Sequence, residues 1–472
     1  MSEELKYAVI DQGSTSTKCA LADGAGRISG EISESTPQRT QDGRREVDAE
    51  AVADSVEGLL ERLLQSGSVD GIGLACQRST CLLWDRESGT ALTPALSWQD
   101  TSQVARTRSL AGHAEDVAQR TGLRLSPYYA APKLAALLEE YPDGHARAAQ
   151  GEIVAGTLDA FLMHRLTGSP STEPGHAGRT LLYNLSQGTW DSELCELFGV
   201  PMAALPTLHP SAGAWGEHRG IPVCAGAGDQ QAALIGHGGW QPGTVAVHFG
   251  TGAFVLASVG QRVHRADGLL SAVLASTPNG RRFQLEGTVN SAGSAVDWAC
   301  RLTNQPIGAW IDRDLVPEEL PWAVPALAGI GAPWWKPQAR GVVYGLSTAT
   351  RGEDLVGGVL FGLAMRVVDN LEAMAAGGTQ PRVVRLSGKL TRLQGLVGLI
   401  ADAARLPVEV SRHEETGLVG IGRLVAAGAS DRESSLLFDP PASSHREPGW
   451  SADRVQSIRA RWRQLITSSF GG

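Results

Sequence analysis

Two similar strand–turn–strand patterns, one near the start of the chain and one about halfway along it, constrain the fold more than any other feature. In the first, two apolar runs within residues 7–22 flank a small polar turn at residues 11–17. In the second, two apolar runs within residues 244–259 flank a glycine-rich turn at residues 249–252. Short apolar runs around such turns predict β-hairpins. Because each hairpin opens one half of the chain, the pattern indicates an internal duplication of the fold.

Between the two hairpins, helix and strand signals alternate. Asp48 is a favoured helix N-cap residue, and the apolar residues after it, beginning with Val52 and Val56, recur with helical spacing. The apolar run at residues 71–76 then predicts a strand. This β-then-α order is typical of an α/β domain.

Glycine and proline mark two interruptions in the regular pattern. Residues 169–178 are rich in Ser, Pro, Gly and Thr, so we expect a long loop there. The segment Gly-Trp-Gln-Pro-Gly at residues 239–243 breaks regular structure. We place the domain boundary in this segment, which gives domains at residues 1–240 and 241–472.

Net charge bears on the possible partners, and cysteine usage bears on the cellular compartment. The formal net charge of -9 disfavours nucleic acid and anionic membranes, because the average surface would repel both. The six cysteines are scattered without a C-x-x-C pair, which is typical of reduced structural cysteines. No signal peptide and no membrane-spanning stretch is recognisable. We expect a cytoplasmic protein with neither nucleic acid nor membrane as a partner, and the sequence leaves a homo-oligomer open.

The two hairpin turns are the best candidates for binding phosphate. The chain has no Walker-type G-x-x-x-x-G-K-[ST] loop and no G-x-G-x-x-G motif after its first strand. A tight turn of Gly, Ser and Thr exposes N–H groups and hydroxyls that suit phosphate oxygens. One such turn is usually a plain hairpin, but two of them predict a nucleotide held between similar domains. Asp11, at the first turn, is a candidate magnesium ligand, because hard cations prefer carboxylates.

Asp229 follows an apolar run and precedes an Ala-rich run, which places it at a strand-to-helix junction. Asp is favoured as a helix N-cap, and this role alone would explain the residue. A carboxylate at an interdomain cleft could equally accept a proton from an attacking hydroxyl. The spacing does not separate these two interpretations.

Six short motifs in a fixed order resemble the carbohydrate kinases named for their F-G-G-Y signature. They are D-Q-G-S-T-S-T from residue 11, C-Q-R-S-T from residue 76, S-W-Q-D from residue 97, G-D-Q-Q from residue 228, F-G-T-G from residue 249 and G-A-P-W-W from residue 331. Within that family the glycerol kinase branch is the nearest match, and G-T-L-D from residue 156 and R-T-L-L-Y-N from residue 179 match it too. The resemblance runs from about residue 7 to about residue 422. The ordered set is specific, although each motif alone is weak.

The resemblance implies an α/β fold of two actin-like (ribonuclease H-like) ATPase domains with a cleft between them. The first domain would hold the substrate pocket and the first phosphate hairpin, and the second would hold the other hairpin and the adenine side. ATP and Mg²⁺ are the implied cofactors, with Asp229 as the general base, Asp11 as the metal ligand and Thr251 in contact with the transferred phosphate. The implied nucleotide-binding residues are Gly13, Ser14, Thr15, Ser16, Gly250, Thr251, Gly252, Gly293, Asp297, Gly388 and Lys389. The implied substrate pocket comprises Arg78, Ser79, Trp98, Tyr128, Gln230 and Phe254.

The sequence departs from glycerol kinases both where the acceptor and where the nucleotide are expected to bind. Ser79 stands where they usually carry Glu, and Asp297 stands where they carry Gln. Near the adenine, Lys389 and Leu393 replace a glycine and an asparagine in an ungapped match. One gap would bring Arg392 into register instead.

The function that fits best is transfer of the γ-phosphoryl group of ATP to a hydroxyl of a small polyol or sugar, with an acceptor larger than glycerol. One alternative is a non-catalytic regulator that binds a sugar or nucleotide on the same fold. The altered adenine segment favours it, and the intact Asp11, Asp229 and Thr251 disfavour it. A second alternative, an actin-like or heat-shock-type ATPase, is disfavoured by the motifs that serve a small substrate.

Overall fold

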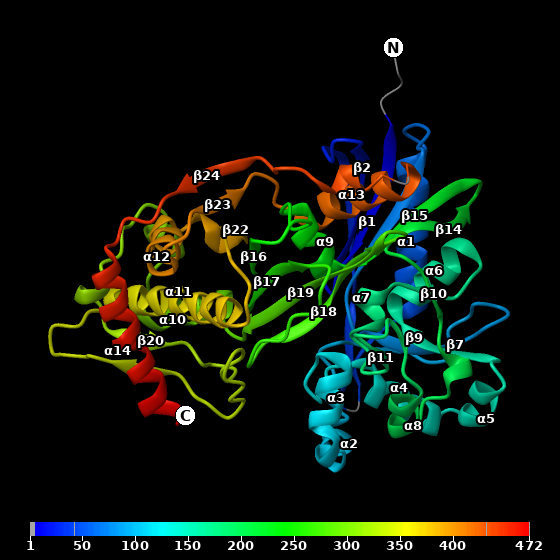
Figure 1. The fold of residues 1–472 in the computed structure, drawn as a ribbon, viewed down its shortest axis with the longest axis horizontal. Helices are drawn as coiled ribbons and strands as arrows, with labels where there is room; N and C mark the ends of the chain where they lie inside the picture. Colours follow the sequence, from blue (N-terminus) through cyan, green and yellow to red (C-terminus); the bar gives the residue numbers. More distant parts are fainter. Residues whose placement is uncertain (1–4, 42, 431, 472) are drawn as a thin grey trace.

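The computed structural model describes residues 5–41, 43–430 and 432–471, and each half of the chain is built on one large sheet (Figure 1). The first sheet has the strand order β14-β15-β6-β1-β2-β3. Its strands are β1 (Lys6–Gln12), β2 (Ser16–Asp23), β3 (Ile28–Ser35), β6 (Gly71–Cys76), β14 (Ala212–His218) and β15 (Ile221–Gly228). Strand β1 pairs antiparallel with β2 and parallel with β6, which in turn pairs parallel with β15.

The second sheet repeats this arrangement. Its order is β18-β19-β17-β16-β22-β23-β24. Its strands are β16 (Thr244–Phe249), β17 (Ala253–Gly260), β18 (Leu270–Thr277), β19 (Gly280–Val289), β22 (Val383–Gly388), β23 (Val408–Ser411) and β24 (Ala442–Arg446). Strand β16 pairs antiparallel with β17 and parallel with β22, which pairs parallel with β23. A hairpin followed by two parallel strands therefore occurs in both halves, which confirms the expected hairpins and the duplication.

Helices and a smaller sheet surround the two large sheets (Figure 1). The smaller sheet belongs to the first half and has the order β4-β5-β8-β7-β9, formed by β4 (Gln38–Gln41), β5 (Arg44–Val47), β7 (Cys81–Asp85), β8 (Ala95–Leu96) and β9 (Ile153–Thr157). The helices of the first half are α1 (Ala49–Leu64), α2 (Val104–Ser109), α3 (Ala114–Thr121), α4 (Ala130–Glu140), α5 (Gly144–Ala149), α6 (Leu158–Thr167), α7 (Pro174–Ala177), α8 (Ser192–Phe198) and α9 (Asp229–Gly236). Those of the second half are α10 (Gly293–Thr303), α11 (Gly352–Ala376), α12 (Gln394–Ala404), α13 (Thr416–Ser430) and α14 (Ala452–Phe470).

Helix α1 forms where the sequence predicts it. The Asp48 carboxylate accepts a hydrogen bond from Ala51 N–H at 3.1 Å and so caps the helix, as expected. Val52, Val56 and the apolar residues that follow them at helical spacing are buried against the first sheet. The predicted strand at residues 71–76 is β6, and it is buried along its whole length.

The prediction of a long loop at residues 169–178 is wrong. This segment contains a two-residue strand, β10 (Ser171–Thr172), and the short helix α7, and most of it is buried. Glu173 explains why a polar stretch can be ordered inside the protein, because its carboxylate accepts from Gly175 N–H and His176 N–H at 2.7 Å each and caps α7.

Helix α13 comes from the second half of the sequence but packs on the first sheet and on α9, as the orange helix beside β1 in Figure 1 shows. Glycines allow this close approach: a Cβ at Gly420 would lie 1.8 Å from the carbonyl oxygen of Ala232, and one at Gly236 would lie 2.0 Å from that of Thr416. The domain boundary at residue 240 falls between α9 and β16 and stays a prediction, because α13 links the two parts of the chain.

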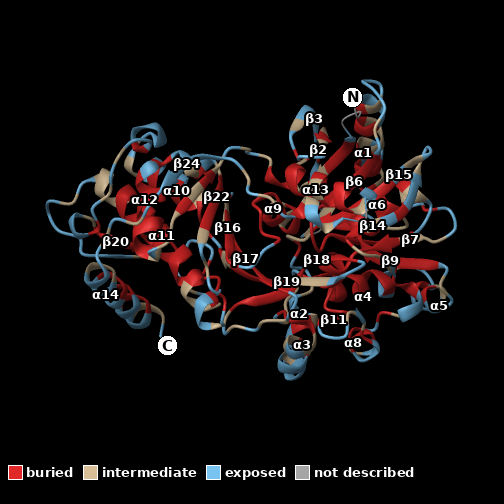
Figure 2. Cartoon of the chain, turned by 45° about the horizontal axis from the view of Figure 1, so that its top comes forward, coloured by how far each residue is buried: buried red, intermediate tan, exposed pale blue. Residues whose placement is uncertain are grey.

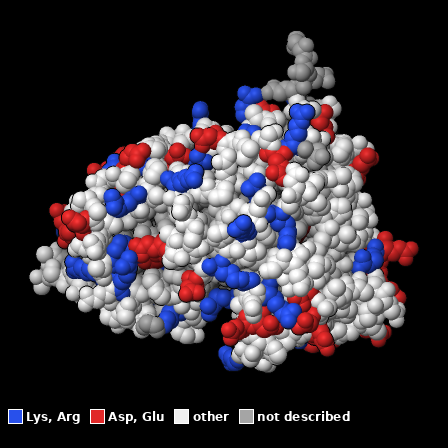
Figure 3. All heavy atoms as spheres, in the orientation of Figure 1, with Lys and Arg blue, Asp and Glu red and all other residues white. Residues whose placement is uncertain are grey.

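The core follows the two sheets. Figure 2 shows buried residues along both sheets and the helices next to them, with exposed residues on the peripheral loops and along α14. All six cysteines are buried and free, as expected. Lys and Arg are interspersed with Asp and Glu on the face shown in Figure 3. Within the described part of the chain, none of the helices has the length and apolar character needed to cross a membrane.

Candidate functional site

The first hairpin turn is compact and open to solvent. Gly13 N–H donates to the carbonyl oxygen of Ser16 at 2.9 Å, which closes the turn between β1 and β2. Ser14 is half-buried and Thr15 is exposed. The turn therefore presents hydroxyls and N–H groups at the surface, as phosphate binding requires.

Asp11 lies near the carboxyl end of β1, beside other carboxylates. Burial, together with the negative charges of Asp229 and Glu415, raises the pKa of Asp11 to about 7, although Lys18 opposes the shift. Gly417, at the start of α13, packs closely against this carboxylate, because a Cβ there would lie 2.6 Å from Asp11 Oδ2. The structure thus places two acidic groups, Asp11 and Asp229, within electrostatic reach of one another.

The second hairpin turn is docked on the N-terminus of α10. Gly250 N–H donates to the Gly252 carbonyl at 2.9 Å, Gly293 N–H donates to the Gly250 carbonyl at 3.0 Å, and Ala292 N–H donates to the Thr251 carbonyl at 2.9 Å. A Cβ at Gly293 would lie 2.6 Å from the Gly250 oxygen, so this contact requires glycine. Thr251 is exposed at the tip of the turn.

Asp229 is the first residue of α9, whereas the N-cap position belongs to Gly228. The capping interpretation of Asp229 is therefore wrong in detail, although its Oδ1 accepts a hydrogen bond from Gln230 N–H at 2.7 Å. The carboxylate is half-buried, and its Oδ1 lies 3.7 Å from Arg78 Nε. A partly accessible carboxylate can contact a bound hydroxyl and accept its proton.

Arg78 belongs to a buried ion network that joins the two halves of the protein. Its guanidinium donates to the carboxylate of Glu286 on β19 at 2.7 Å, and Arg179 donates to the same carboxylate at 2.6 Å. Burial alone would raise the pKa of Glu286, but the charges of Arg179 and Arg78 outweigh it and lower the pKa to about 2. Glu286 is thus the partner that the buried Arg78 requires.

Lys133 holds three segments of the expected pocket together. Its buried ammonium group donates to the backbone carbonyls of Ser79 at 2.7 Å, Ser97 at 2.9 Å and Tyr128 at 3.2 Å. Burial lowers the pKa of Lys133, and the negative charge of Asp100 is among the influences that oppose this shift. The backbone next to Arg78, Trp98 and the Tyr128 ring is therefore fixed by one side chain.

The remaining expected pocket residues lie around Asp229 and the segments that Lys133 holds together. Gln230 follows Asp229, and its amide Oε1 is buried without a hydrogen-bond partner in the described part of the chain. The guanidinium of Arg78 lies 5.7 Å from the ring centroid of the half-buried Phe254. Trp98 is half-buried, and the Tyr128 side chain is 50% exposed, so its ring is free to meet a ligand.

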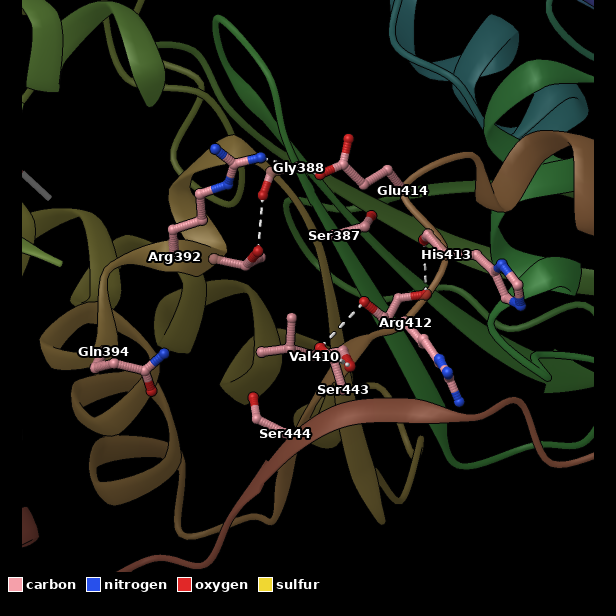
Figure 4. Close-up of a pocket in the computed structure, with 12 residues that line it drawn as sticks. Ser387, Gly388, Arg392, Gln394, Val410, Arg412, His413, Glu414, Ser443 and Ser444 are labelled. Carbon is pink, nitrogen blue, oxygen red and sulfur yellow. Dashed lines mark hydrogen bonds and ion pairs between the residues drawn. The ribbon is translucent and has the colours of Figure 1, made fainter. Parts of the chain in front are cut away.

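On the nucleotide side, a cavity of about 360 Å³ opens at the carboxyl ends of β22 and β23 (Figure 4). Ligands in open α/β sheets commonly bind at such strand ends. Gly388 lines the cavity, and its φ of 95° together with a 2.2 Å approach to the Phe249 oxygen excludes a side chain there. The other lining residues are Ser387, Thr391, Arg392, Gln394, Val410, Ser411, Arg412, His413, Glu414, Ser443 and Ser444.

Of the eleven expected nucleotide-binding residues, Gly388 lines this cavity and the other ten do not. Asp297 is exposed on α10, and Lys389 is exposed where the 3₁₀ helix η5 (Lys389–Arg392) begins. Leu393, which follows η5, is 2% exposed and packs in the core of the second half.

Sequence reasoning missed Glu286 and Lys133, and it assigned no role to Arg179. One signal was available for Glu286, a lone acid in an apolar strand, since a buried charge requires a partner or a ligand. Lys133 looks like an ordinary residue of an Ala-rich helix, and only the tertiary structure shows the carbonyls that it contacts.

Comparisons with known proteins agree with the duplicated fold. The family model for the N-terminal domain of the FGGY family of carbohydrate kinases matches residues 6–236, and the model for the C-terminal domain of that family matches residues 245–430. Glycerol kinase from Xanthobacter autotrophicus is 34% identical over 98% of this chain and 98% of its own length. Glycerol kinase from Citrifermentans bemidjiense is 33% identical with the same two coverages.

Solved structures share the whole fold. The structure of Plasmodium falciparum glycerol kinase with ADP matches with a TM-score of 0.91 at 23% identity, covering 99% of this chain and 98% of that one. A xylulose kinase from Brucella ovis matches with a TM-score of 0.90 at 22% identity, covering 98% and 99%. At these identities the likeness establishes the fold, two actin-like ATPase domains, as the sequence predicts. With two family models covering most of the chain and relatives alike over nearly all of it, this protein belongs to the FGGY family of carbohydrate kinases.

Proposed function

We propose that Asp229 is the general base of this ATP-dependent polyol or sugar kinase. The observation that carries the proposal is the position of the Asp229 carboxylate, 3.7 Å from Arg78 on the acceptor side and close enough to Asp11 on the other side to raise its pKa. A base for phosphoryl transfer must stand between the acceptor and the phosphate, and the position of Asp229 between Arg78 and Asp11 supports this role.

The reaction requires little covalent chemistry from the protein. The acceptor hydroxyl oxygen attacks the γ-phosphorus, a new P–O bond forms as the bond to the β-phosphate oxygen breaks, and ADP leaves. Asp229 accepts the hydroxyl proton. Thr251 and the two glycine-rich turns would position the transferred phosphate, and closure of the two halves would exclude water that could hydrolyse ATP.

The acidic groups near Asp229 fit a magnesium ion that arrives with ATP. Among the described residues no cluster of three or more side chains could hold a metal on its own. Magnesium is usually bound by one or two carboxylates together with phosphates and waters, so a large cluster is not required. Asp11 would hold the ion, and bound magnesium would offset the negative charge of the phosphates.

Acceptor binding falls to the residues around the ion network. Arg78 and Gln230 would hydrogen-bond hydroxyls, while Trp98, Tyr128 and Phe254 would cover the carbon chain. The glycerol kinases at 33% and 34% identity support a polyol acceptor. The presence of Asp11, Asp229 and Thr251 supports turnover rather than binding alone. We also propose that the enzyme works in the cytoplasm, in keeping with its six free cysteines.

ADP release measured with a panel of three- to five-carbon polyols and ketoses tests this function. Asp229→Asn keeps the shape of the side chain but cannot accept the proton, so kcat should fall by roughly two to four orders of magnitude while acceptor binding survives. Asp48→Asn, at the cap of α1, removes the same charge far from the site and should leave kcat unchanged. Near-normal turnover by Asp229→Asn would show that another group is the base.

A further inference from the structure

The acceptor side of the site contains more buried hydrogen-bond donors than acceptors. Arg78 and Arg179 share the single carboxylate of Glu286, at 2.7 Å and 2.6 Å. All three side chains are at least nine-tenths buried. Arg78 also faces Asp229 at 3.7 Å, so its charge has two carboxylates nearby, whereas the Arg179 guanidinium hydrogen-bonds to Glu286 alone among the described residues.

Arg179 has unused donors at the site. Its Nη2 donates to Glu286, but its Nε and Nη1 are buried and have no hydrogen-bond partner among the residues that the structure describes. The guanidinium lies 5.5 Å from the ring centroid of Tyr129, which attracts the cation but is not a carboxylate or carbonyl acceptor. Buried polar groups in native proteins are usually hydrogen-bonded, so unpartnered donors beside the residues proposed to bind the acceptor point to a ligand that supplies the missing hydrogen-bond acceptor.

Ser79 supplies no carboxylate that could accept these hydrogen bonds. Its backbone lies beside Arg179, because Ser79 Oγ donates to the Arg179 carbonyl at 3.3 Å. Glycerol kinases usually carry Glu at this position, so this chain has one carboxylate fewer there. Asp100 does not replace it, because its carboxylate accepts from Arg45 N–H at 2.8 Å and from Ser102 N–H at 3.0 Å.

We propose that the acceptor itself carries a carboxylate, so that the substrate is a polyhydroxy acid with four or more carbons. Its carboxylate accepts hydrogen bonds from Arg179, and the hydroxyl at its far end reaches Asp229 past Arg78. Arg78 and Arg179 belong to the first half of the chain and Glu286 to the second. If the two halves separate to admit the acceptor, the same movement uncovers the Arg179 nitrogens. This proposal rests on the proposed kinase function and specifies its substrate class.

Acceptors matched in length and differing only in charge test the proposal directly. ADP release above the acceptor-free background is measured with glycerol and glycerate, erythritol and erythronate, and ribitol and ribonate. We expect the four- and five-carbon acids to exceed their matched polyols in kcat/KM by at least tenfold. Equal values, or higher values for the polyols, would overturn the proposal.

Two variants at residue 79 separate charge from size. Ser79→Glu restores a carboxylate beside Arg179 and should lower kcat/KM for the acids by at least tenfold relative to the polyols. Ser79→Gln adds the same bulk without charge and should preserve the ratio of acid to polyol. A ratio that changes equally in both variants would contradict a charge effect, and if either variant fails to fold, the wild-type comparison alone decides.

The same panel distinguishes failure of this proposal from failure of the kinase function. Turnover with neutral acceptors and none with acids rejects only the acidic acceptor. No ADP release with any neutral or acidic acceptor rejects the kinase function. Binding of erythronate and ribonate to Asp229→Asn, measured by titration calorimetry, provides a readout that does not depend on turnover, and absent binding there counts against the acidic acceptor.

Discussion

The buried ammonium group of Lys133 lies 2.7 Å from the carbonyl oxygen of Ser79. The same group donates to Ser97 and Tyr128, so one helical residue fixes three loops that converge on the acceptor pocket. A cation bound to backbone oxygens holds the loops whatever their side chains are. Lys133 is therefore a positioning residue, which acts on the acceptor through the groups that it orients.

Replacement of Lys133 by Met should impair acceptor recognition more than nucleotide use. The variant leaves three buried carbonyls without their donor, so we expect destabilisation of about 2–4 kcal/mol and a rise in KM for the acceptor of about tenfold or more. The KM for ATP should change by less than about twofold, because Lys133 contacts only acceptor-side loops. Lys6→Met, at the opposite end of β1, provides a control at an exposed lysine. An equal rise in both KM values would indicate a general structural defect.

Glu286 should control stability in acid. In the folded protein its pKa is lowered to about 2 from a model-compound value of 4.5, so folding favours the ionised form. Its contribution is therefore fully present above about pH 5 and is lost as the pH falls from about 4.5 to about 2. Glu286→Gln, which leaves two buried guanidinium groups without a charged partner, should lose about 3–5 kcal/mol at neutral pH.

Urea unfolding from pH 7 to pH 2 checks this prediction. The difference in unfolding free energy between the wild type and Glu286→Gln should shrink over the acid range. A difference that stays constant down to pH 2 would show that the charge of Glu286 is not what stabilises the fold. Glu115→Gln, at an exposed position of α3, serves as the control.

The features predictable from the sequence are those encoded by neighbouring residues. The hairpins and α1 are recognisable because a turn or a cap and its apolar flanks lie within about twenty positions. Pairing of Arg78 with Glu286 joins residues 208 positions apart, and no local pattern reveals it. Composition predicts a loop for the segment containing Glu173, and this prediction fails for a related reason. The polar residues of the segment find hydrogen-bond partners inside the protein, which composition does not show. Assignments that come through family motifs, such as Asp229, do not reveal the contacts of the residues they name, and the role of Asp229 stays a prediction.

Among neutral acceptors, glycerol should be a poor substrate. Ser79 is shorter than the usual Glu and its hydroxyl donates to the Arg179 carbonyl, so the pocket has more space and one strong acceptor fewer for a small triol. We expect kcat/KM for glycerol to lie below the values for erythritol, xylulose and ribulose. Specificity constants under one set of conditions decide the point, and a glycerol value well above the other three would refute it.

Nucleotide selection should be weak, because the segment that would recognise adenine is altered. In the ungapped match Leu393 stands where glycerol kinases have an asparagine, and it is buried in the core, where it offers no hydrogen bond to a base. Arg392, the residue that a gap would bring into register, is ion-paired with Glu414 at 3.2 Å. Lys389 is exposed beside Gly388, where its ammonium group can meet the ribose or a phosphate.

The specificity constants for ATP and GTP should therefore differ by less than about tenfold in the wild type. Lys389→Gly should raise the KM for both nucleotides by a similar factor of about three to ten, because a charge-assisted contact to ribose or phosphate does not distinguish the bases. The KM for the acceptor serves as the internal control and should not change. A strong preference for ATP that survives in Lys389→Gly would mean that base recognition lies elsewhere, within the cavity that Gly388 lines, and that Lys389 has no part in it.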